Sequence, residues 1–83
     1  MRNLIRIEAP DALRGFLLLQ ELPPVAARVE MTGGRCAVEI DPQGSDVGAL
    51  ASGLLQAVRA WLRDADLEET TLHVGPTPLR ITA

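Results

Sequence analysis

Hydrophobic and polar residues along this chain alternate with two periods, which separate the expected helices from the expected strands. In the stretch Asp46–Asp64, apolar residues recur every three or four positions, the spacing of a helix packed along one side. They fall on one arc of that helix: Val47, Leu50, Ala51, Leu54, Leu55, Val58, Trp61 and Leu62. This stretch is the longest periodic segment and contains the only Trp. We therefore expect it to form the main helix over the core.

A period of two residues marks the expected strands. Alternating apolar and polar positions predict strands at Asn3–Glu8, Val25–Met31, Arg35–Asp41 and Thr70–Gly75, with a short closing strand at Leu79–Thr82. Gly33 and Gly34 lie between the second and third of these segments, and glycine adopts the positive φ of a tight turn without strain. This predicts a hairpin. We expect Pro76-Thr77-Pro78 to interrupt the chain before the closing strand.

A second helix is predicted over Asp11–Leu22. Asp11 suits the N-cap position, and Pro23 disfavours helical backbone in the residue before it. Gly15 should weaken this helix by about 1 kcal/mol relative to alanine. The large apolar residues divide into two faces, one with Leu13, Phe16 and Leu17 and the other with Leu18, Leu19 and Leu22. A two-layer fold buries only one face fully, so the second leucine face either lies under a loop, is lost to early fraying of the helix, or is an exposed patch that meets a partner.

The order of these elements predicts one domain over residues 1–83 of the α+β class. The simplest packing is a two-layer α/β sandwich, with an antiparallel sheet covered on one face by both helices. This is a ferredoxin-like βαββαβ arrangement with a short extra C-terminal strand. Its first and third strands would be central. The other face of the sheet would carry charged and polar side chains.

The main helix also has a flank of small residues at four-residue spacing: Ala49, Gly53, Ala57 and Ala60. Small side chains let another backbone come close, either the other helix of the same chain or a second copy. The candidate interaction residues are Leu18, Leu19, Leu22, Ala49, Gly53 and Ala57.

Charge and composition exclude several classes of function. The 83 residues carry a net charge of −3, all basic residues are Arg, and the only aromatic residues are Phe16 and Trp61. Nucleic-acid binding is not expected, because it needs clustered positive charge or aromatic residues for base stacking. No apolar run reaches the roughly 20 residues that span a bilayer. Cys36 has no partner for a disulfide, and the first residues do not resemble a signal peptide, so we expect a cytoplasmic protein without membrane contact.

The sequence predicts no catalytic, cofactor-binding or metal site. His73 is the only His and should lie on the open sheet face, beside Glu8 or Glu39. A His–carboxylate pair can transfer protons. However, the thiol of Cys36 should point into the core and no nucleophile is expected beside His73. A ligand-binding domain or enzyme that uses the open face around His73 remains the alternative function, and it predicts a concave pocket there.

The C-terminal half resembles a small bacterial module, the effector-associated constant component of conflict and signalling systems. The similar segments are the helix end Ala60-Trp61-Leu62-Arg63, the strand Thr71-Leu72-His73-Val74 and the final strand Leu79-Arg80-Ile81-Thr82, about half the chain. The small-residue-rich segment that precedes this helix in the family is absent. The resemblance implies a non-catalytic adaptor encoded near an effector enzyme. We therefore expect a non-enzymatic interaction module that docks on a partner protein or forms a homo-oligomer.

Overall fold

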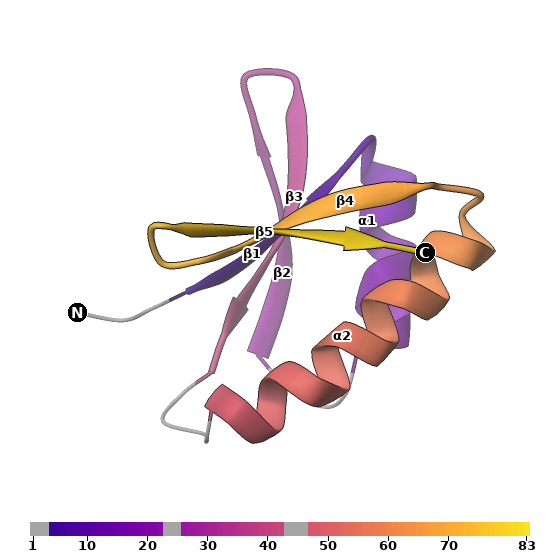
Figure 1. Ribbon diagram of the computed structural model, residues 1–83. Coiled ribbons are helices and arrows are strands. Elements are labelled where there is room, and N and C mark those ends of the chain that lie inside the picture. Colours follow the sequence, from indigo (N-terminus) through magenta and orange to yellow (C-terminus); the bar gives the residue numbers. More distant parts are fainter. Residues whose placement is uncertain (1–3, 23–25, 43–46) are drawn as a thin grey trace.

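Within the described residues, the chain forms five strands and two helices (Figure 1). The computed structural model describes residues 4–22, 26–42 and 47–83, without the side chains of residues 47–49 and 51. The elements are β1 (Ile5–Ala9), α1 (Ala12–Glu21), β2 (Ala26–Thr32), β3 (Arg35–Asp41), α2 (Val47–Asp64), β4 (Glu69–Val74) and β5 (Thr77–Thr82). The predicted helix start at Asp46, the predicted strand start at Val25 and the helix-ending Pro23 lie outside the described residues.

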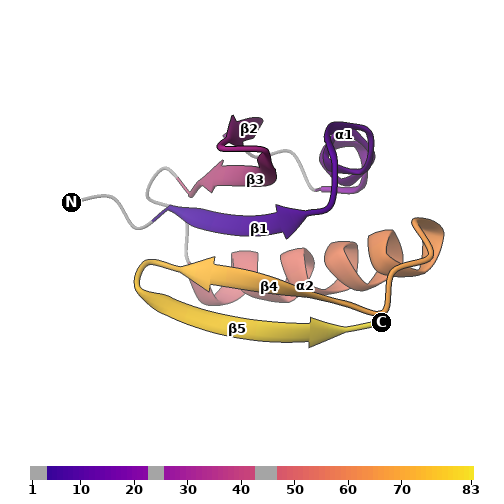
Figure 2. The ribbon, with the colours of Figure 1, turned by 90° about the horizontal axis from the view of Figure 1, so that it is seen from above.

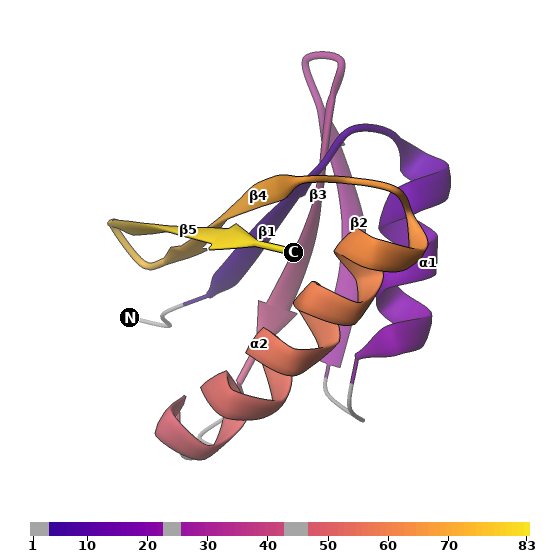
Figure 3. The same ribbon diagram turned by 45° about the vertical axis from the view of Figure 1, so that its right-hand side comes forward.

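The strands form one antiparallel sheet in the order β2-β3-β1-β4-β5 (Figure 2). The first and third strands lie inside it, as predicted, and β2 and β5 form its edges. Both helices cover the same face of the sheet (Figure 3). The α+β class is therefore confirmed, with a strand layer and a helix layer around one hydrophobic core.

Two tight turns define the hairpins. The predicted β2–β3 hairpin turns at Gly33 and Gly34, whose φ values of 58° and 78° favour glycine. A second hairpin, which the sequence did not predict, joins β4 to β5 through Gly75, at φ 59°, and Pro76.

The expected break at Pro76-Thr77-Pro78 is confirmed at Pro76, which lies in the turn, but Thr77 and Pro78 already belong to β5. Pro78 sits within this strand opposite His73. Proline is tolerated there because β5 is an edge strand, and the missing N–H falls on its unpaired side. Glu69, one residue before the strand predicted at Thr70–Gly75, is the first residue of β4 and binds Arg80 on β5.

Trp61 of α2 joins the two helices. Its side chain is 1% exposed, and its indole Nε1 donates a hydrogen bond of 2.8 Å to the backbone carbonyl of Arg14 in α1. Leu54, Val58 and Leu62 of the predicted arc are also buried, whereas Leu55 is 37% exposed. The amphipathic pattern therefore identified most of the buried face of α2.

Gly15 is the point at which α1 comes closest to the sheet. A Cβ atom at this position would lie 3.3 Å from Cys36 Sγ and 3.4 Å from Val29 Cγ1, closer than most such contacts. Gly15 therefore lowers the intrinsic stability of the helix but allows α1 to pack closely against the sheet. Asp11 begins the helix as predicted, since its Oδ1 accepts the Arg14 N–H at 2.8 Å.

Candidate functional site

The outward face of α1 is the reverse of the predicted one. Leu18 is fully buried, and Leu19 and Leu22 pack against the core. The interaction hypothesis that placed these three leucines on an exposed patch is therefore corrected. The exposed side chains are those of Leu13 (71% exposed), Phe16 (55%) and Leu17 (40%), which we call the α1 patch.

The sequence held a signal for this orientation. Gly15, Leu18, Leu19 and Leu22 have the i, i+3, i+4, i+7 spacing of a single stripe. Gly15 belongs to this stripe although it has no side chain, because that absence lets the helix pack close to the sheet. When only large apolar residues are counted, the sequence does not show which of the two faces of α1 is buried.

The small-residue flank of α2 is only partly described. The side chain of Ala49 lies outside the described residues, Gly53 is exposed and Ala57 is half-buried. α1 and α2 contact each other within the chain, as the Trp61 hydrogen bond shows. The expectation that α2 packs against the other helix of the same chain is therefore confirmed. The structure does not bring Gly53 and the leucines of α1 together as one exposed surface.

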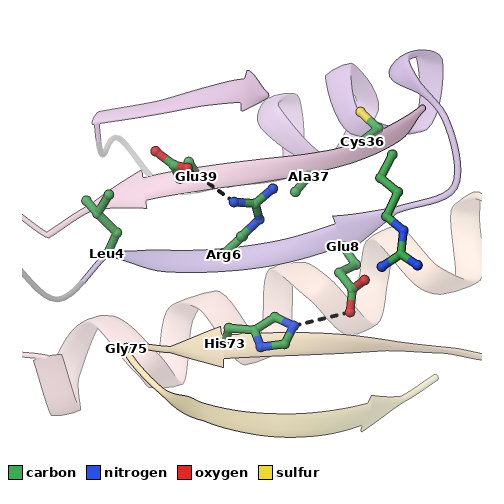
Figure 4. Close-up of a pocket in the computed structure, with 9 residues that line it drawn as sticks. Leu4, Arg6, Glu8, Cys36, Ala37, Glu39, His73 and Gly75 are labelled. Carbon is green, nitrogen blue, oxygen red and sulfur yellow. Dashed lines mark hydrogen bonds and ion pairs between the residues drawn. The ribbon is translucent and has the colours of Figure 1, made fainter. Parts of the chain in front are cut away.

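The open face of the sheet has a hollow of about 680 Å³ beside His73 (Figure 4). β1, β3 and β4 contribute its walls, and neighbouring positions across the strands carry opposite charges. Arg6 Nη1 lies 3.7 Å from Glu39 Oε2, and His73 Nε2 lies 3.2 Å from Glu8 Oε2. The expected pairing of His73 with Glu8 is confirmed, whereas Glu39 binds Arg6 and Arg28 instead.

The hollow offers a His–carboxylate pair without a nucleophile next to it. Cys36 is buried, and its Sγ lies near Gly15 of α1, on the helix side of the sheet. Arg35 also lines the hollow, and within the described part of the chain it has no ion-pair partner. Arg6 is already paired with Glu39, so Arg35 is the unpaired cation of the hollow among the described residues, and it suits a small anion.

A second hollow lies on the helix side of the sheet, between α2 and the β4–β5 hairpin, and we call it the β5 groove. Its volume is about 370 Å³ and its lining is mostly apolar. Buried side chains form its floor, and partly exposed ones form its rim. The floor includes Ile5, Leu54, Leu72 and Ile81; the rim includes Leu55, Arg59 and Leu79. No signal in the sequence located this groove, because it depends on how α2 lies relative to β5.

Ion pairs along the β4–β5 edge are formed within the chain. Arg80 Nε and Nη2 donate to the two carboxylate oxygens of Glu69 at 2.7 and 2.8 Å. These hydrogen bonds lower the pKa of Glu69 and raise the pKa of Arg80. Between the helices, the neighbouring Asp64 carboxyl raises the pKa of Glu21, because protonated Glu21 can share its proton with that group.

No cluster of three metal-ligating side chains occurs among the residues that the structure describes. Neither helix in those ranges combines the length and the hydropathy that crossing a membrane requires.

Comparisons with protein-family models, with curated proteins and with solved structures found no match for this chain. Its function is therefore argued from its own geometry.

Proposed function

We propose that this protein is a non-enzymatic interaction module that associates with a second copy of itself through the α1 patch. The observation that carries the proposal is the exposure of Leu13, Phe16 and Leu17 side by side on one helix. Their i, i+3, i+4 spacing makes one contiguous apolar surface. Large exposed apolar patches mark interaction sites, whereas single exposed leucines are ordinary.

The size of the α1 patch sets the strength of this association. Three side chains exposed to this degree offer on the order of 300 Å² of apolar surface. A stable interface buries about 800 Å² from each partner. The α1 patch therefore supports a reversible, concentration-dependent dimer, in which the polar residues around it supply the remaining contact.

Light scattering coupled to size-exclusion chromatography tests this proposal. We expect the apparent mass of the wild-type protein to rise with concentration, and Phe16→Glu to keep it at the monomer value because a charge enters the apolar contact. Leu79→Glu is the matched control, since it places the same charge on an exposed apolar residue far from α1 in the sequence. A wild-type protein that stays monomeric at millimolar concentration, with no effect of Phe16→Glu, would contradict self-association.

The proposed module has a ferredoxin-like topology, a role as an adaptor and a cytoplasmic location. We assign the ferredoxin-like arrangement because β1 and β3 lie inside the sheet and both helices lie on one face. The resemblance around Ala60-Trp61-Leu62-Arg63 supports a role as an adaptor beside an effector enzyme in a bacterial conflict or signalling system. A reduced cytoplasm suits the single buried thiol of Cys36.

The hollow on the open face favours a second candidate function, the binding of a small anionic ligand. A concave site beside His73 is what this alternative predicted, and Arg35, which has no ion-pair partner among the described residues, supplies positive charge there. The test is a titration with acetate and with phosphate, followed by the backbone amide NMR signals. We expect saturable shifts centred on β1 and on residues 35 and 73, which Arg35→Gln weakens and Arg63→Gln does not. Uniform or unsaturable shifts would contradict this function.

A further inference from the structure

We propose that the β5 groove binds an extended peptide segment of a partner protein, with apolar side chains at alternate positions and a carboxylate that meets Arg59. This inference concerns a different surface from the α1 patch and does not depend on self-association. It adds a peptide-binding site to the proposed module, and it would make the module able to join two proteins.

The lining of the groove suits the apolar side chains of a strand placed beside β5. Its floor is apolar and already belongs to the core, through Leu54, Leu72 and Ile81. Leu79 on the rim is 50% exposed although its register position faces the helix side of the sheet. Apolar side chains from a neighbouring strand would therefore cover Leu79 and Leu55 and remove their surface from water.

The outer edge of β5 offers backbone groups for such a strand. The two-residue turn makes Val74 and Thr77 a hydrogen-bonded pair, and these pairs alternate along an antiparallel ladder. Ala83 follows the same alternation, since its N–H binds the Glu68 carbonyl at 3.0 Å. The N–H and C=O groups of Arg80 and Thr82 therefore point away from β4. No strand in the described part of the chain pairs with that side.

Strand addition uses this combination of features. An extended peptide binds an open sheet edge through its main chain, and pockets for alternate side chains supply specificity. At β5, the main-chain groups belong to Arg80 and Thr82, and the β5 groove is the pocket on one face of the added strand.

Charge identifies the class of peptide. Arg59 lines the groove, and within the described residues its guanidinium has no ion-pair or hydrogen-bond partner. Arg80 is unavailable, because Glu69 binds it through both carboxylate oxygens. A carboxylate on the peptide would pair with Arg59 at the edge of an apolar site, where such a contact is screened less than on open surface.

A second copy of this chain fits the groove less well. Its β5 would direct Thr77, Leu79 and Ile81 toward the groove, and none of these carries a carboxylate. Pairing of two β5 strands would also leave both Arg59 side chains without an acidic partner. Charge complementarity therefore favours a different protein as the occupant.

The test uses the full chain and a synthetic probe, the capped peptide acetyl-Thr-Val-Thr-Val-Thr-Glu-Thr-amide. A matched probe carries Gln in place of Glu. We expect saturable binding of the first probe, NMR shifts along β5 and the groove, and slowed amide exchange at Arg80 and Thr82. The Gln probe should bind about tenfold more weakly, the effect of losing one hydrogen bond between charged groups.

Three variants test whether Arg59 makes the proposed contact. Arg59→Gln should weaken binding of the Glu probe about tenfold. It should leave binding of the Gln probe unchanged, because that probe already lacks the carboxylate that contacts Arg59. Arg63→Gln, which removes the same charge elsewhere on α2, should change neither affinity. Phe16→Glu should also leave probe binding unchanged, even where it abolishes self-association.

Several outcomes would overturn the inference. No saturable binding at millimolar probe concentration would do so, as would equal affinities for the two probes or shifts centred on the open face. A dimer that Leu79→Glu dissociates would also overturn it, because the groove would then hold a second copy.

Discussion

Replacing Trp61 with alanine is expected to lower the free energy of unfolding by about 3–5 kcal/mol. The ring is buried between the helices and the sheet, so its removal leaves a large cavity in the core. The substitution also leaves the Arg14 carbonyl without its 2.8 Å hydrogen bond. A domain of this size has a total stability of about 4–12 kcal/mol. Chemical denaturation followed by circular dichroism should therefore show an unfolded or marginally stable protein.

Trp61→Phe is the matched control for this prediction. It keeps an aromatic ring in the core but removes the indole N–H, so the cost should be smaller, about 1–3 kcal/mol. A Trp61→Ala protein with an unchanged denaturation midpoint would mean that Trp61 lies on a surface, in contradiction to the structure.

Leu18→Glu is expected to prevent folding. Leu18 is fully buried on the sheet side of α1, and an unpaired buried carboxylate costs several kcal/mol. Leu13→Glu introduces the same side chain into the same helix, at a position that is mostly exposed. Its effect on the free energy of unfolding should stay within about 0.5 kcal/mol.

Circular dichroism and the dispersion of amide NMR signals distinguish these two variants. We expect a random-coil spectrum for Leu18→Glu and a native spectrum for Leu13→Glu. The reverse result, a folded Leu18→Glu and an unfolded Leu13→Glu, would mean that α1 is rotated by about half a turn from its orientation in the structure.

The open face of the sheet was predictable in detail. Alternation placed Arg6, Glu8, Glu39 and His73 on one side of their strands, and two-residue periodicity leaves no other choice once the strands are known. That placement left Glu8 and Glu39 as possible partners of His73, and the structure selects Glu8. The partners of Glu39 also needed the register, which sets it directly opposite both Arg6 and Arg28.

The β5 groove and the extent of β5 could not be predicted in the same way. Leu79 was expected in a strand that faces the core, and its half-exposure arises because β5 lies at the edge of the sheet, where Leu79 lines the hollow beside α2. Pro78 reads as a strand breaker in sequence, and only its position at an unpaired edge makes it compatible with β5. Both features depend on elements that are distant along the chain.

Local pattern alone determined where the helices and the three inner strands lie, because the side-chain spacing that marks each element lies within its own segment. It also determined the β2–β3 turn, since Gly33 and Gly34 supply the required backbone angles. The rotation of α1 was decided by packing. Two apolar faces were nearly equivalent in sequence, and the close approach of Gly15 to Cys36 and Val29 selected the one with Leu18. Burial of that face leaves Leu13, Phe16 and Leu17 exposed to water, and the proposed interaction surface consists of these three residues.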